Sequence, residues 1–176
     1  MIRVWDPFVR AFHWALAASF MVAWVSSENW EGLHDASGYV AGGLVALRFL
    51  WGFVGPRYAR FAQFVRPPKT VIDYLLAIRD GSERRYIGHN PAGGAMIVVL
   101  LAAMAATAFS GWLLTIDAFW GSSVLQHVHS ALAHGVLALM ILHLAGVALA
   151  SLRHHENLVR SMVVGMKRPA GPGDVA

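Results

Sequence analysis

The sequence predicts an all-α integral membrane protein, a four-helix bundle surrounded by lipid. Of its 176 residues, 57% are hydrophobic and only 14% are charged, and the mean hydropathy is +0.52. A water-soluble domain is about half apolar and about a quarter charged, so this composition indicates a membrane solvent. Four apolar stretches, each long enough to cross a bilayer, complete the pattern. We expect residues 1–176 to form a single domain.

The four membrane helices follow from length and composition. A helix rises about 1.5 Å per residue, so about 20 apolar residues cross the hydrocarbon core. The third and fourth stretches contain no Asp, Glu, Lys or Arg. The predicted spans are residues 8–25, 36–54, 92–116 and 130–152.

A short surface helix is predicted in the polar stretch between the second and third spans. Pro56, Pro67 and Pro68 interrupt this stretch, and residues 69–80 follow them. The apolar residues of this segment fit a helix that lies along the membrane interface. They are Val71, Ile72, Leu75, Leu76 and Ile78.

The charges predict the orientation in the membrane, because retained loops are rich in Lys and Arg and translocated loops are not. All fourteen Lys and Arg residues lie in the N-terminal segment, in the group from Arg48 through Arg85, or in the tail from Arg153 onward. The two remaining loops, 26–35 and 117–128, contain four carboxylates and no basic residue. We therefore expect a multi-pass membrane protein with both termini in the cytoplasm.

Several classes of function are disfavoured. The chain has no cysteine, which excludes iron–sulfur clusters, thiolate zinc sites and the covalent attachment of c-type haem. The basic residues are explained by topology, so no nucleic-acid partner is expected. The first apolar stretch carries Arg10 and His13 and has no small-residue cleavage motif, so we interpret it as a membrane helix and not as a removable signal peptide.

The histidines are the candidates for chemistry, since a polar ring inside a membrane needs a partner. His13 and His143 lie in the half of the bilayer near the cytoplasm, and His34 and His129 lie at the outer boundary. Each depth-matched pair could supply the two axial ligands of one non-covalent haem. We call these the inner pair and the outer pair.

Helical geometry allows the fourth span to serve both pairs. His129 and His143 are 14 residues apart, which is about 40° short of four full turns and about 21 Å along the axis. Both rings therefore leave nearly the same face, one near each membrane surface. His134 and His127 lie well off this face and are interpreted as structural or supporting residues.

Other residues near the pairs allow two interpretations. Arg10 and Arg48 could neutralise haem propionates, or they could simply extend to the interface as inner-side cations. Small residues on the second and third spans could make room for a flat cofactor or only for a neighbouring helix. The histidines themselves could instead bond to Ser or Thr across helices, or relay protons.

The chain resembles the prokaryotic cytochrome b561 family, which includes the b-type cytochrome subunits of membrane hydrogenases, over essentially its whole length. The resemblance rests on motifs in every part of the chain. These are Phe12-His13-Trp14, His34 with Gly38, Gly88-His89-Asn90-Pro91, Val128-His129-Ser130-Ala131-Leu132, His143, and the tail Glu156-Asn157-Leu158-Val159-Arg160-Ser161-Met162.

The resemblance implies two haem b groups with bis-histidine ligation, by His13 with His143 and by His34 with His129. It also implies exchange of electrons between the quinone pool, ubiquinone or menaquinone, and a redox partner. The short outer loops favour a small periplasmic c-type cytochrome over a hydrogenase as the partner, and a periplasmic dehydrogenase stays an alternative. The absence of outer basic residues makes superoxide, an anion, a weaker fit.

Three functions remain as hypotheses at this point. The first is an electron-transfer protein of the respiratory chain, and the second is an oxidoreductase that turns over alone with quinone or superoxide. The third is a haem-free membrane protein whose histidines serve structure or proton transfer. Turnover without a partner separates the first two, and absence of a Soret band in the purified protein would favour the third.

Overall fold

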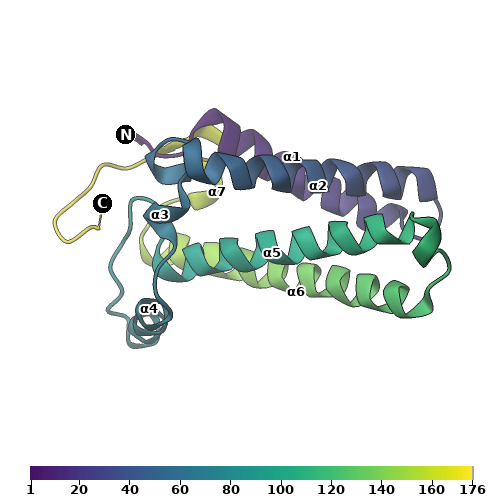
Figure 1. Cartoon of the computed structure of the whole chain (residues 1–176). Coiled ribbons are helices and arrows are strands. Elements are labelled where there is room, and N and C mark those ends of the chain that lie inside the picture. Colours follow the sequence, from purple (N-terminus) through teal and green to yellow (C-terminus); the bar gives the residue numbers. More distant parts are fainter. Residues whose placement is uncertain (176) are drawn as a thin grey trace. The chain divides into compact units, whose positions relative to one another are not determined.

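The computed structural model describes residues 1–175, and most of them are helical. Four long helices dominate the chain (Figure 1). Each is long and apolar enough to cross a membrane, which confirms the predicted all-α fold with four candidate spans. They are α1 (Pro7–Ser26), α2 (Glu31–Val54), α5 (Pro91–Leu114) and α6 (Ser123–Arg153).

Two of these helices begin earlier than the hydropathy pattern predicted. The helix α2 begins at Glu31 and not at Ala36, and α6 begins at Ser123 and not at Ser130. Hydropathy detects only the apolar part of a helix, whereas backbone hydrogen bonding continues through polar turns. A carboxylate such as Glu31 is also favourable in a first turn, where the helix dipole is positive. His34 and His129 therefore lie within α2 and α6 and not at the N-terminal ends of these helices.

The chain forms two compact units, and the division between them crosses all four long helices. Unit 1 comprises Met1–Arg10, Trp51–Val99 and Ile141–Ala176. Unit 2 comprises Ala11–Leu50 and Leu100–Met140. The single domain expected over residues 1–176 stays a prediction.

Unit 2 is a four-helix bundle with a small interior. Its buried cluster takes Phe20 from α1, Ala41 and Val45 from α2, Met104 from α5 and Val136 from α6. The outward side chains are also apolar, as expected where lipid is the solvent and the interior is not the only apolar environment.

Close approach of two helices in unit 2 depends on a small residue. A Cβ added to Gly42 of α2 would lie 3.4 Å from the Cβ of Ala108 on α5. Association of helices in lipid relies on such close packing, because the hydrophobic effect does not drive it there. Gly42 therefore serves helix packing, which is one of the two roles predicted for these small residues.

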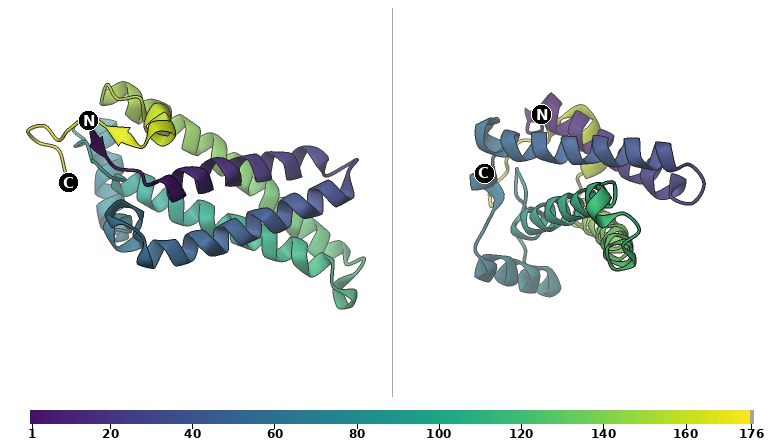
Figure 2. Two further views of the ribbon diagram at one scale, coloured as in Figure 1. Left: turned by 90° about the horizontal axis from the view of Figure 1, so that it is seen from above. Right: turned by 45° about the vertical axis from the view of Figure 1, so that its right-hand side comes forward.

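Unit 1 ties the beginning of the chain to its end. Strand β1 (Ile2–Arg3) pairs antiparallel with β2 (Met166–Lys167), as the left-hand view of Figure 2 shows. Helix α7 (Leu158–Val164) precedes β2, and its Ser161 Oγ accepts a hydrogen bond from Trp5 Nε1 at 3.3 Å. Gly165 ends α7 with φ +81°, and a Cβ there would lie 2.7 Å from the Trp5 carbonyl oxygen. The turn after α7 thus requires glycine.

The segment between α2 and α5 forms the short helix that the sequence predicted. After the short helices η1 (Arg57–Ala59) and α3 (Phe61–Phe64), α4 runs over Pro68–Asp80. Gly81, with φ +71°, caps the C-terminal end of α4. Its apolar residues Ile72, Leu75 and Leu76 are exposed. This exposure agrees with a helix at the interface, and its membrane contact stays a prediction.

A buried ionic cluster in unit 1 joins the middle loop to the tail. Arg85 donates to Glu156 Oε1 at 2.7 Å, to the Asp174 carboxylate, and to the Arg168 carbonyl oxygen at 3.1 Å. Lys167 Nζ lies 3.5 Å from Glu156 Oε2. Burial alone would raise the pKa of the Glu156 carboxyl, but hydrogen bonds and nearby cations hold that pKa below its ordinary value. Two of the basic residues interpreted as topology signals are therefore also structural.

We expect Arg85→Met to destabilise the folded protein by about 3 kcal/mol, because it leaves the carboxylates of Glu156 and Asp174, whose side chains are 8% and 11% exposed, with one remaining cation. Chemical unfolding in detergent, followed by circular dichroism, measures the change. Lys69→Met is the matched control, since the Lys69–Asp73 pair has side chains that are 85% and 57% exposed and should contribute little. Equal effects of the two substitutions would contradict a structural role for the cluster.

Candidate cofactor cavity

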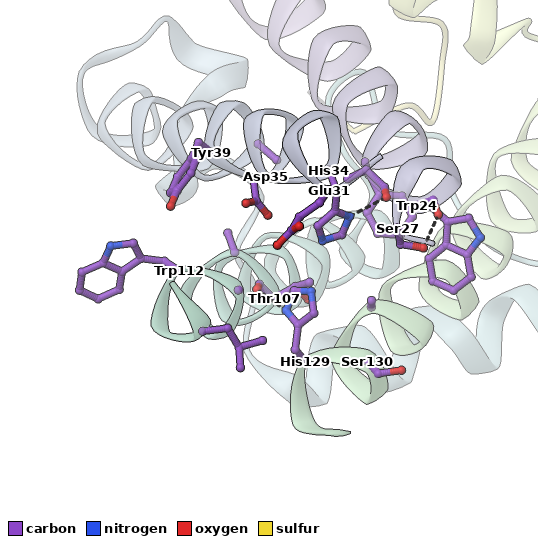
Figure 3. Close-up of a pocket in the computed structure, with 18 of the residues that line it drawn as sticks. Trp24, Ser27, Glu31, His34, Asp35, Tyr39, Thr107, Trp112, His129 and Ser130 are labelled. Carbon is purple, nitrogen blue, oxygen red and sulfur yellow. Dashed lines mark hydrogen bonds between the residues drawn. The ribbon is translucent and has the colours of Figure 1, made fainter. Parts of the chain in front are cut away.

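Unit 2 contains a cavity of about 840 Å³ at the end formed by the loops between α1 and α2 and between α5 and α6. Residues of all four helices line it, including Trp24, His34, Thr107 and His129 (Figure 3). Cavities of about 300–1,000 Å³ are typical of sites for organic ligands and cofactors. The size and the two histidines make this the candidate cofactor cavity.

His34 of α2 and His129 of α6 face each other across the cavity (Figure 3). Their ring centroids are 6.0 Å apart and the ring planes are 84° apart. A metal ion bound by imidazole lies about 2 Å from the coordinating nitrogen. Two such bonds, with each ring centre about 1 Å behind its nitrogen, place the centroids about 6 Å apart. The spacing of the outer pair therefore fits one metal ion between the rings.

Hydrogen bonds to backbone carbonyl oxygens orient the rings of both His34 and His129. His34 Nδ1 lies 2.8 Å from the Ala23 carbonyl oxygen, and His129 Nδ1 lies 3.1 Å from that of Thr107. A carbonyl oxygen only accepts, so we assign the ring proton to Nδ1 in both residues. The Nε2 atoms then carry the free lone pairs. Histidines that bind metals characteristically donate their other nitrogen to a carbonyl or carboxylate in this way.

Glycine leaves room beside both histidines. A Cβ added to Gly38, one turn after His34, would have no atom within 4 Å, so this position opens onto the cavity. A Cβ added to Gly111 would lie 3.0 Å from His129 Cε1. The first glycine leaves open space in the cavity beside His34, and the second leaves room for the His129 imidazole.

Carboxylates give the cavity mouth a negative charge. Glu28, Glu31 and Asp35 line the cavity, and none of its lining residues is Lys or Arg. Figure 3 shows Glu31 and Asp35 on the same helix as His34. Such a mouth attracts cations and repels anions.

The inner pair is divided between the two units. His13 lies in unit 2, half-buried, with its ring 5.1 Å from that of Trp14 in an edge-on arrangement. His143 lies in unit 1 and is also half-buried. The helix α6 is unbroken from His129 to His143, as the argument from helical phase requires. The pairing of His13 with His143 stays a prediction.

The two candidate arginines differ in their surroundings. Arg10 donates from Nη1 to the Val163 carbonyl oxygen at 2.6 Å within unit 1, so at least part of its guanidinium binds α7. Arg48 belongs to unit 2 and is only 3% exposed. Contact of either residue with a propionate stays a prediction.

The remaining histidines have other contacts. His127 and His134 each place Nδ1 within hydrogen-bond distance of a carbonyl oxygen one turn earlier in α6. His134 also lines the cavity, with its ring 4.9 Å from that of Trp24. His89 packs between Trp5 and Phe64 in unit 1. The structure therefore supports a structural interpretation of His127 and gives His134 a place at the cavity wall.

The sequence interpretation missed the residues that support His129. Ser110 Oγ lies 3.0 Å from His129 Nδ1, beside the Thr107 carbonyl oxygen. A signal was present, because Thr107 and Ser110 are polar residues three positions apart, and hence on one face, in an otherwise apolar helix. The partner on another helix could not be predicted from that spacing.

Comparison with known proteins identifies one family. Residues 4–165 match the sequence model described as prokaryotic cytochrome b561. No curated protein and no solved structure matches the chain.

We expect Gly38→Leu to lower the haem content of the purified protein, because a Cβ at this position meets no atom within 4 Å and the leucine side chain would take up cavity space beside His34. A pyridine haemochrome assay, referred to polypeptide concentration, measures the loss. Gly43→Leu is the control, since a Cβ at Gly43 also meets no atom within 4 Å but Gly43 does not line the cavity. Unchanged haem content in Gly38→Leu would argue against an occupant beside His34.

Proposed function

The chain belongs to the prokaryotic cytochrome b561 family and is therefore a membrane b-type cytochrome of electron transfer, and from this premise we propose its specific role. We propose that it binds two haem b groups through paired histidines. It carries electrons across the bacterial inner membrane between quinone and a periplasmic redox protein. Haem supplies the one-electron chemistry of iron, and the protein supplies ligands, position and surroundings.

The observation that carries this proposal is the geometry of the outer pair. The two rings lie 6.0 Å apart, and the Nδ1 atom of each is held by a backbone carbonyl. Both Nε2 lone pairs are then available to one iron. A purely structural pair of histidines would not need this separation or a cavity of about 840 Å³ around it.

The inner haem of the proposal rests on the sequence of α1 and α6. His13 lies a turn and a half into the first span, and His143 lies about 21 Å along α6 from His129. The two sites would then lie near opposite surfaces of the membrane, with the inner site serving quinone, either ubiquinone or menaquinone.

Charge supports the proposed orientation. Thirteen of the fourteen Lys and Arg residues belong to unit 1, and the remaining one is the buried Arg48 of unit 2. Both termini also belong to unit 1, so the positive-inside rule assigns them to the cytoplasm. The carboxylate-lined cavity then opens toward the periplasm.

The cavity mouth supports a cationic partner. With Glu28, Glu31 and Asp35 at the cavity, a soluble c-type cytochrome with lysines around its haem edge would be attracted electrostatically. The same carboxylates repel superoxide, so we favour electron carriage over the oxidation of superoxide.

Histidine substitutions test the haem assignment. We expect two haems per chain in the unaltered protein and one in each of four variants, because each variant removes an axial ligand. His34→Ala and His129→Ala should lose the outer haem, and His13→Ala and His143→Ala the inner one. The pyridine haemochrome assay and redox titration count and distinguish the haems. His127→Ala, which alters an exposed histidine of the same helix, should keep both, and retention of both haems in any of the four variants would refute its pair.

Neutralising the mouth tests the choice of partner. We expect Glu28→Gln with Glu31→Gln to slow electron transfer to a cationic soluble c-type cytochrome a few-fold at low ionic strength, because steering depends on unscreened charge. Stopped-flow spectroscopy measures the rate, and the difference should vanish at high salt. The control is Asp73→Asn with Asp80→Asn on α4, which removes two exposed carboxylates of unit 1. An equal slowing by both pairs would contradict docking at the cavity mouth.

A further inference from the structure

Three polar groups meet behind His129 in unit 2. His129 Nδ1 lies 3.0 Å from Ser110 Oγ and 3.1 Å from the Thr107 carbonyl oxygen. The Ser110 hydroxyl lies 2.9 Å from the same Thr107 carbonyl oxygen. Ser110 is only 4% exposed, so these contacts are shielded from solvent.

The direction of each hydrogen bond follows from the chemistry of the groups. The Thr107 carbonyl oxygen can only accept, and the Ser110 hydroxyl donates its one proton to it. The Ser110 oxygen therefore presents a lone pair to His129 and accepts from Nδ1–H. The single imidazole proton thus has two acceptors, one from the backbone and one from a side chain.

Ser110 differs in this respect from comparable buried serines of the same unit. The hydroxyls of Ser26 and Ser37, which are 1% and 8% exposed, donate to carbonyl oxygens of their own helices. Ser110 makes the same kind of bond within α5, but its oxygen also reaches a histidine on α6. Hydrogen bonding within α5 alone therefore does not account for the contact between Ser110 and His129.

The next residue restricts the ring from another direction. A Cβ at Gly111 would lie 3.0 Å from His129 Cε1, which is closer than ordinary carbon contact. The ring therefore packs directly against the α5 backbone. Together, the hydrogen bond from Nδ1 and this contact define the tilt of the imidazole.

We propose that Ser110 is a positioning residue for His129. Ser110 orients the His129 ring and increases the electron donation of His129 Nε2 to the outer haem iron. An acceptor on Nδ1–H makes the imidazole a stronger ligand. A stronger donor stabilises ferric over ferrous iron, so Ser110 lowers the potential of the outer haem. This inference rests on the proposed function, since it requires the outer haem.

Redox titration with electron paramagnetic resonance tests the inference in the full-length, haem-loaded protein. In Ser110→Ala we expect both haems to remain, because both axial ligands are intact. The midpoint potential of the outer haem, identified as the component missing from His129→Ala, should rise, and that of the inner haem should not change. The low-spin ferric signal of the outer haem should also shift, since it depends on the relative orientation of the two imidazole planes.

Two further variants separate this role from simple packing. Ser37→Ala removes another buried hydroxyl, which donates to the Leu33 carbonyl oxygen of its own helix, and it should leave both potentials unchanged. Ser110→Thr keeps a hydroxyl at the position and should return the outer potential toward that of the unaltered protein. If Ser110→Ala loses the outer haem, retention of that haem in Ser110→Thr supports the proposal, and its loss there too overturns it.

The test distinguishes failure of this inference from failure of the proposed function. Two haems with an unchanged outer potential and an unchanged ferric signal in Ser110→Ala would overturn the role of Ser110 alone. An unaltered protein that lacks the haem of His34 and His129 would overturn the proposed function.

Discussion

A polar ring inside a membrane has no water to bond, and the candidate site is organised by this constraint. The Nδ1 atoms of His34 and His129 lie close to the carbonyl oxygens of Ala23 and Thr107 on neighbouring helices. These bonds make an imidazole tolerable in lipid. They also hold the proton on Nδ1 and leave the Nε2 lone pair for a metal. The same hydrogen bond from Nδ1 to a carbonyl oxygen thus satisfies each buried ring and leaves its Nε2 able to act as a ligand.

Small residues connect helix packing with the cavity. At Gly42 the absence of a side chain lets α2 approach Ala108 of α5, whereas at Gly38, one turn earlier, it leaves open space beside His34. Glycine therefore allows close helix packing at position 42 and leaves open space in the cavity at position 38. Since lipid does not drive helices together, packing of this kind must be local and close. A cofactor that fills the opening would itself contribute to the interior of unit 2.

Charge is distributed unevenly between the two units, and this distribution serves more than topology. Unit 1 holds nearly all of the basic residues, and two of them, Arg85 and Lys167, pair with the Glu156 carboxylate in an ionic cluster that joins the middle loop to the tail. Three of the four carboxylates of unit 2, Glu28, Glu31 and Asp35, line the cavity instead. One segment of each long helix thus belongs to the cation-rich unit 1. The other segment belongs to unit 2, whose cavity is lined by carboxylates. This division is the basis of the proposed orientation, with the cation-rich unit on the cytoplasmic side.

Hydrophobic length and composition alone determined the four apolar helices and the short helix after Pro68, because these are local properties of the chain. The positions of His34 and His129 in their spans predicted an equal depth for the two rings. The structure also shows α2 beginning at Glu31, which hydropathy does not reveal because helical hydrogen bonding continues beyond the apolar stretch. Tertiary packing decided the contacts between helices and loops. It alone brought Ser110 to His129 and Arg85 to Glu156. Those contacts join residues far apart in the chain, and the register of one helix or loop against another comes from packing and not from any single helix's periodicity.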